Sequence, residues 1–118
     1  MSNRGKRDLA NYDLPYHDYY HADVESTVNA YTVGTNNMGQ GRDQKKRFVS
    51  KSTLIYCTEA TTIHFNNSNN VAIAILANTW YTFYSNIYSI NHALISQGNN
   101  LYVYFEGVLP EDCGIAEA

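Results

Sequence analysis

Residues 71–105 read VAIAILANTWYTFYSNIYSINHALISQGNNLYVYF, and this stretch decides the fold. Apolar residues, many of them β-branched or aromatic, follow a period of two over 71–76 and again over 101–106. Turns containing Asn or Gly interrupt the stretch about every ten residues, and no Pro or Gly lies inside a run. Alternation of this kind is typical of antiparallel strands that bury one face. We therefore predict an all-β domain.

The remaining chain adds further short strands around this stretch. A length of 118 residues is sufficient for one hydrophobic core. The full pattern predicts an antiparallel β-sandwich or jelly roll of about seven strands. The expected strands are 22–33, 45–57, 61–65, 71–76, 79–84, 87–92 and 101–105. We expect three parts: an extended N-terminal arm (1–21), the β-sandwich domain (22–107) and a C-terminal tail (108–118).

The N-terminal arm is polar, with irregularly spaced Tyr and Leu residues and with Pro15 opposing a helix. Such a segment has too little regular apolar surface to fold alone, so we expect it to become ordered on binding. Its own domain or a neighbouring chain could hold it, and we favour the neighbour. The expected anchors of this interface are Leu14, Tyr16, Tyr19 and Tyr20.

Charge is divided unevenly along the chain. All eight Lys and Arg residues lie in positions 1–51 beside six acids, a net of +2, whereas positions 52–118 hold five acids and no Lys or Arg, a net of −5. One basic and one acidic end permit contacts between copies, so we expect a homo-oligomer. The basic contact to an acidic neighbour is expected at Arg42, Lys45, Lys46 and Arg47.

Nucleic acid is the alternative partner for this basic cluster. A sheet that binds nucleic acid interleaves basic residues with exposed aromatic residues, but here the cluster precedes its strand. We therefore expect a solvated or protein-facing patch. A membrane is not expected either, because no apolar run reaches the roughly 20 residues of a spanning helix and the N-terminus has no apolar signal-peptide core.

Candidate catalytic and metal-binding residues do not form a convincing pattern. His17 and His21 would share one face of a helix, as zinc ligands do, but their surroundings do not predict a helix. Cys57, Glu59 and His64 lie in one strand–turn–strand unit without a recognisable nucleophile context. We expect no enzymatic activity, no cofactor and no metal, and we expect both cysteines to be reduced thiols.

Aromatic residues are abundant in the second half of the chain. Adjacent strands could align several of them as a platform for sugar stacking, which would define a glycan- or receptor-binding module. The alternative places Trp80 and Phe83 in the core and the tyrosines in protein interfaces, and we favour this alternative. The set comprises Trp80, Tyr81, Phe83, Tyr84, Tyr88, Tyr102 and Tyr104.

Four segments carry a resemblance to a known class of proteins: RFVSKST (47–53), IHFNNSNN (63–70), ILANTWYTFYSNIYSI (75–90) and LYVYFEG (101–107). Their succession resembles small β-sandwich structural proteins of tailed bacteriophage virions, whereas residues 1–44 have no comparable match. The resemblance implies a non-enzymatic virion component, assembled in the host cytoplasm. It would be a capsid decoration (cement) protein that binds the major capsid protein, with a neck or tail adaptor as the alternative.

Overall fold

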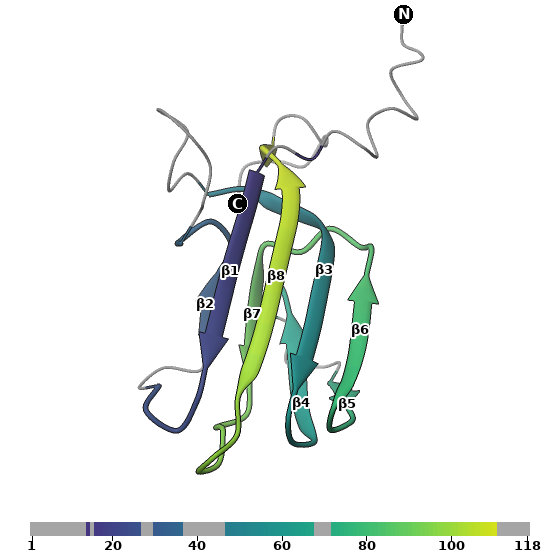
Figure 1. The fold of residues 1–118 in the computed structure, drawn as a ribbon. Helices are drawn as coiled ribbons and strands as arrows, with labels where there is room; N and C mark the ends of the chain where they lie inside the picture. The colour runs from purple at the N-terminus through teal and green to yellow at the C-terminus, as the bar shows by residue number, and fades with distance from the viewer. Residues whose placement is uncertain (1–13, 15, 27–29, 37–46, 68–71, 111–118) are drawn as a thin grey trace, which may run out of the picture.

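The computed structural model describes residues 14, 16–26, 30–36, 47–67 and 72–110. Within these residues the chain forms eight strands and no α-helix. The strands make two four-stranded antiparallel sheets that pack face to face as a sandwich (Figure 1). The all-β sandwich is thereby confirmed, with eight strands where the sequence predicted about seven.

The first sheet has the strand order β1-β8-β3-β6. Its members are β1 (Tyr16–Ala22), β8 (Leu101–Val108), β3 (Val49–Cys57) and β6 (Thr79–Phe83). The second sheet has the order β2-β7-β4-β5. Its members are β2 (Ala30–Thr32), β7 (Ser89–His92), β4 (Thr61–Phe65) and β5 (Ile73–Ile75).

The pairing of strands follows a simple rule. β1 pairs with β8, β2 with β7, β3 with β6 and β4 with β5, all antiparallel. These four pairs are those of one long hairpin with its tip between β4 and β5, folded over so that its pairs are distributed between two sheets. Only the β4–β5 connection stays within one sheet, and every other connection crosses to the opposite sheet.

The core lies between the two sheets and is built by alternation along each strand. In β8, the residues Leu101, Val103 and Phe105 are buried, whereas Tyr104 and Glu106, on the opposite face, are exposed. The second sheet contributes Tyr31, whose ring stacks on Phe105 with centroids 5.8 Å apart. The other fully buried large apolar side chains are Val33, Phe48, Ile55, Ile63, Ile75, Ile87 and Ile90. The alternation predicted over 101–106 is therefore confirmed.

The predicted N-terminal arm is wrong in its last residues. Tyr16–Ala22 is β1, an edge strand of the first sheet, and its burial alternates with period two. Tyr20 is buried against Tyr31 of the opposite sheet, with ring centroids 4.4 Å apart. Its register with β8, from Tyr16 opposite Gly107 to Ala22 opposite Leu101, joins the two ends of the described chain. Residues 1–13 lie outside the described residues.

The strand predicted over 22–33 is also wrong in its first half. Asp23 begins a turn in which its carbonyl accepts the Ser26 amide and its side chain accepts the Glu25 amide. Asp and Ser favour such turns because their side chains bond to nearby backbone groups. Strand β2 comprises only Ala30–Thr32. The predicted strand over 61–65 is confirmed as β4, and the remaining predicted strands keep their places with shifted ends.

A buried carboxylate connects β1 to the segment that follows β2. Asp18 is 1% exposed, and its Oδ2 accepts the Tyr31 hydroxyl at 2.5 Å and the Gly34 amide at 2.6 Å. Its Oδ1 accepts the Tyr19 amide at 2.8 Å. Burial raises the pKa of Asp18, and these hydrogen bonds partly offset that rise. The carboxylate therefore fixes the β2 turn onto the edge of the first sheet.

A buried histidine joins the two sheets in a similar way. His92 Nδ1 lies 2.7 Å from the Ala93 carbonyl oxygen, so it must donate, and Nε2 then accepts the Tyr20 hydroxyl at 2.8 Å. Burial lowers the pKa of His92, which is 3% exposed. The neutral ring is therefore the form that the folded protein favours.

Acid should weaken the fold through His92. Because its folded-state pKa lies below the unfolded value of about 6.5, the unfolded chain binds the proton more readily. The free energy of unfolding should then fall as pH drops below about 6.5. Urea titrations at neutral and mildly acidic pH measure this fall, and His92→Gln should show a smaller one. The raised pKa of Asp18 should increase the free energy of unfolding as pH falls. Because Asp18 is present in both proteins, its contribution cancels when the two falls are compared. An equal fall in both proteins would contradict the assignment.

Candidate functional site

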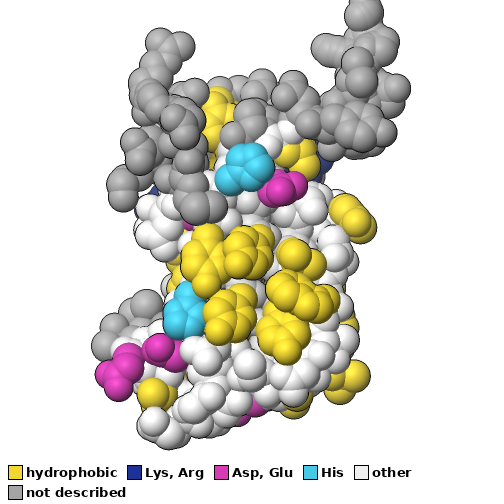
Figure 2. All heavy atoms as spheres, in the orientation of Figure 1, with side chains coloured by type: hydrophobic (Ala, Val, Ile, Leu, Met, Phe, Trp, Pro, Cys, Tyr) yellow, Lys and Arg dark blue, Asp and Glu magenta, His cyan; other side chains and the backbone are white. Residues whose placement is uncertain are grey.

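The outer face of the first sheet carries an aromatic row across all four strands. Strand register places His21 opposite Tyr102, Tyr102 opposite Tyr56, and Tyr56 opposite Trp80. These four residues point away from the core because their strand neighbours Tyr20, Val103, Ile55 and Tyr81 point inward in the same register. Figure 2 shows apolar side chains gathered across the middle of this face. We call His21, Tyr102, Tyr56 and Trp80 the aromatic row.

Rings in the aromatic row contact one another from end to end. The centroid distances are 5.2 Å from His21 to Tyr102, 6.4 Å from Tyr102 to Tyr56 and 4.7 Å from Tyr56 to Trp80. Offset contacts at such distances are favourable for aromatic pairs. Polar contacts hold the row near both ends. Asn100 Oδ1 lies 2.9 Å from His21 Nε2, and Asn78 Oδ1 accepts the Tyr56 hydroxyl at 3.1 Å.

A second row lies two residues along each strand. Tyr19 opposes Tyr104, Tyr104 opposes Leu54, and Leu54 opposes Thr82. The Tyr19 and Tyr104 rings are 4.8 Å apart, and Tyr104 is 43% exposed. Burial raises the pKa of Tyr19, and the neighbouring phenols of Tyr104 and Tyr102 raise it further. Three tyrosine side chains therefore gather where the two rows meet.

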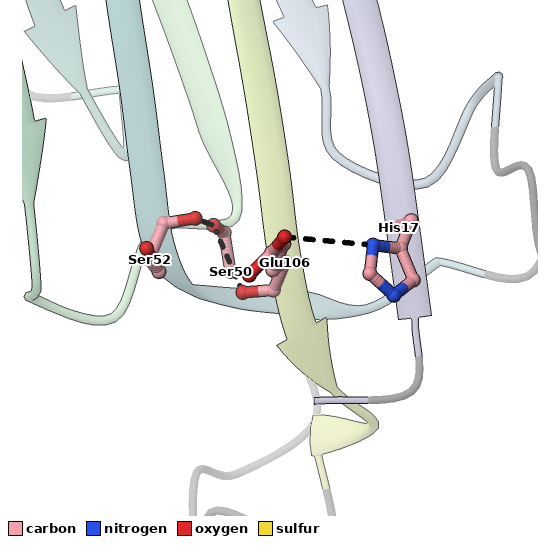
Figure 3. A network of polar contacts seen from close by, with 4 residues as sticks. All are labelled: His17, Ser50, Ser52 and Glu106. Atoms are coloured by element: carbon pink, nitrogen blue, oxygen red, sulfur yellow. Dashed lines mark hydrogen bonds and ion pairs between the residues drawn. The ribbon is translucent and has the colours of Figure 1, made fainter. Parts of the chain in front are cut away.

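The charged end of the outer face lies beyond the second row. His17 Nδ1 is 3.7 Å from Glu106 Oε2, and both side chains are about half exposed (Figure 3). Beside them the Ser50 hydroxyl donates to the Ser52 carbonyl at 2.9 Å and lies 2.7 Å from Thr53 Oγ1. The aromatic row and the second row contain no Lys, Arg, Asp or Glu. The face is thus uncharged in its centre and charged at one end.

The residues expected to anchor an N-terminal arm have different surroundings. Tyr16 and Tyr20 are buried in their own domain, Tyr16 against Phe48 at 5.8 Å, so they cannot be exposed anchors. Leu14 is half-buried, and Tyr19 lies on the outer face beside Tyr104. Of the basic cluster, Arg47 is exposed, whereas Arg42, Lys45 and Lys46 lie outside the described residues.

Trp80 does not lie where the sequence analysis predicted it. It was predicted in the core, but 55% of it is exposed. Phe83 is half-buried and packs edge-on against Phe65 at 5.1 Å, so it does contribute to the interior. The sequence reasoning also missed Tyr56 and His21 as members of an aromatic surface. Alternation along β3 and β1 was the available signal, since both residues alternate with buried neighbours.

The side chains considered for metal binding or catalysis do not come together in a site. His17 and His21 lie on a strand, where four residues span about 13 Å, so they cannot share one metal ion. The Cys57 thiol is free and buried, and burial raises its pKa, which disfavours the nucleophilic thiolate. Glu59 instead accepts the amide and hydroxyl of Ser96 at 2.8 and 2.6 Å and so holds the β7–β8 connection. Among the residues that the structure describes, no three His, Cys, Asp or Glu side chains form a metal-binding group.

Comparison with known proteins returned no match to a family model, to a curated protein or to a solved structure. Within the described part of the chain, no helix is long and apolar enough to cross a membrane. The aromatic outer face is therefore characterised by its geometry and chemistry alone. It offers stacking surfaces, phenol hydroxyls and amide groups, and this combination is suited to binding.

Proposed function

We propose that this chain is a non-enzymatic structural protein of a virion, of the capsid decoration type. The strand order is the observation that carries the proposal. From the sheet orders 1-8-3-6 and 2-7-4-5 we infer an eight-stranded jelly roll, which is the architecture of many viral capsid and lectin domains. The resemblance of residues 47–107 to small phage structural proteins supports the same class. Because a fold alone does not specify a function, the proposal also depends on the residues of the binding surface.

The surface that docks on the shell is the outer face of the first sheet. Interfaces are enriched in Tyr and Trp at their centre and depleted of charge there, as the two aromatic rows are. The burial of Tyr16 and Tyr20 removes two of the four proposed arm anchors and shifts the contact to this face. The partner would be the major capsid protein or another virion subunit. A neck or tail adaptor differs only in the symmetry of its neighbours.

Particles that lack this protein provide the test. Purified protein is mixed with them and the particles are imaged by electron microscopy. Saturable density over the shell is expected for the wild type and for a variant lacking residues 1–13, and much weaker density for Trp80→Ala. Density at a single vertex would instead identify a neck or tail adaptor. The absence of any binding would overturn the virion proposal.

A second candidate is a glycan- or receptor-binding module, and the exposure of Trp80 favours it. A decoration protein that docked through an arm would be expected to bury this indole, whereas a sugar platform requires it in solvent. In the aromatic row, Trp80 and His21 at the two ends are exposed, and Tyr56 and Tyr102 between them are half-buried. The two candidates are compatible in one virion protein that also attaches to a surface.

A further inference from the structure

We propose that the aromatic row is a binding site for a neutral oligosaccharide of two or three sugar rings. This inference rests on the second proposed function and specifies its site and its ligand class. A sugar ring has an apolar C–H face and a rim of hydroxyl groups. Its recognition therefore needs an aromatic surface together with a few fixed hydrogen-bonding groups, as small-molecule sites generally do.

The aromatic row supplies that surface in a fixed arrangement. Each ring contacts the next, and the Asn100 and Asn78 side chains hold His21 and Tyr56 at 2.9 and 3.1 Å. Side chains that are already ordered lose little conformational freedom when a ligand binds. Two of the four strands, β8 and β3, pair with hydrogen-bonded neighbours on both sides, and the inward face of the sheet packs on the core, so the platform is rigid.

The size of the aromatic area matches a small ligand better than it matches a whole protein interface. Three strand spacings separate His21 from Trp80, which is about 14 Å, and the second row lies about 7 Å away. With ring widths included, the two rows cover on the order of 250 Å². A standard protein interface buries about 800 Å² on each partner. The uncharged aromatic area is therefore sufficient for two or three sugar rings, whereas the docking on a virion subunit proposed above would have to extend over the rest of the outer face.

Hydrogen-bonding groups lie beside the stacking surface. Tyr102 belongs to the aromatic row, and the Tyr19 and Tyr104 phenols lie close enough to influence one another. Each phenol hydroxyl both donates and accepts, and the amides of Asn78 and Asn100 add further donors. These groups match the hydroxyl rim of a sugar.

Charge favours a neutral sugar over an acidic one. Of the described cations, Arg47 lies two residues before β3 and Lys51 lies near its beginning, five or more residues before Tyr56. Glu106 at the same end is engaged with His17 at 3.7 Å. No Lys or Arg thus belongs to the aromatic row, whereas a sugar carboxylate or a phosphate would require one. The same argument opposes single-stranded nucleic acid, whose binding needs a basic groove.

Calorimetric titration with maltotriose, chitotriose and lactose tests the proposal, with sialyllactose as the acidic comparison. Trp80 is the single tryptophan of the chain, so its fluorescence gives a second readout at the site. The wild type should bind at least one neutral sugar saturably. Trp80→Ala and His21→Ala, at the two ends of the row, should each weaken binding at least about tenfold, and Trp80→Phe should retain most of it.

Tyr84→Ala is the matched control, because Tyr84 is 76% exposed but lies four residues beyond Trp80, outside both rows. Its sugar affinity should equal that of the wild type. Failure of the wild type to bind any neutral sugar, unchanged binding by Trp80→Ala, or preference for sialyllactose would overturn the proposal. A wild-type dimer that Trp80→Ala converts to a monomer in light scattering would assign the face to a second copy. Particle binding without sugar binding would refute this inference while sparing the virion proposal.

Discussion

The Gly107→Ala variant should lose about 3 kcal/mol or more of its free energy of unfolding. Gly107 is buried in β8, and a Cβ there would overlap the backbone carbonyl oxygen of Val49 and lie 2.8 Å from Ser50 Cα. Overpacking by one methyl group costs about 1–3 kcal/mol when side chains can move. Here the obstacle is backbone, which cannot rotate away. Urea unfolding of both proteins measures the difference.

The backbone beside Gly107 is fixed by the segment between β6 and β7. Register between β3 and β8 shifts between Ser50 and Ser52, and Ser50 forms hydrogen bonds of 2.7 and 2.9 Å with the Ile87 backbone. Gly98→Ala is the control. Gly98 has a φ of 81° with open space around it, so alanine there costs only the conformational strain of about 1–2 kcal/mol. A smaller loss of stability for Gly107→Ala than for Gly98→Ala would contradict the close packing of Gly107 against Val49 and Ser50.

The Asp18→Ala variant should be destabilised by about 2–4 kcal/mol. The substitution leaves the buried Gly34 amide and Tyr31 hydroxyl without their acceptor, and hydrogen bonds to charged groups contribute about 1.5–3 kcal/mol each. Removal of the desolvated carboxylate returns part of that loss, because burying the charge was itself unfavourable. Chemical denaturation at neutral pH measures the result.

Two further variants give this prediction its specificity. Asp18→Asn should recover only part of the stability, because the amide nitrogen cannot accept a hydrogen bond. Asp23→Ala removes a carboxylate that accepts the Glu25 amide at an exposed turn, and it should cost less than about 1 kcal/mol. Equal losses for Asp18→Ala and Asp23→Ala would show that the buried network does not hold the β2 turn.

Local alternation predicted the strands whose inward residues are all apolar. β8 is of this kind, and its position was recovered with a small error at its C-terminal end. β1 could not be recovered in the same way because its inward residues include Asp18. That carboxylate is stable inside only because Tyr31 and Gly34, more than ten residues away, bring donors to it. A sequence pattern does not display such a partnership.

The candidate site was less accessible to sequence reasoning than the fold. In TWYTF (79–83) both faces of the strand carry apolar residues, so alternation leaves the direction of Trp80 open. Register decides it, because Tyr81 faces inward beside Ile55 and Trp80 therefore faces outward beside Tyr56. The aromatic row also draws one residue from each of four strands that are not consecutive in the chain. Neither the pairing order nor the register of such strands can be read from local propensity.

Quenching of Trp80 fluorescence by acrylamide tests the central claim most directly, because this indole reports on the outer face alone. For the free protein we expect emission at the long wavelength of a solvent-exposed indole and efficient quenching. On saturation with a bound neutral oligosaccharide or with particles, the emission should shift to shorter wavelength and acrylamide should quench it less. A short-wavelength emission that resists quenching at every protein concentration would contradict the account, because Trp80 would then be a core residue and the aromatic row would not exist as a surface.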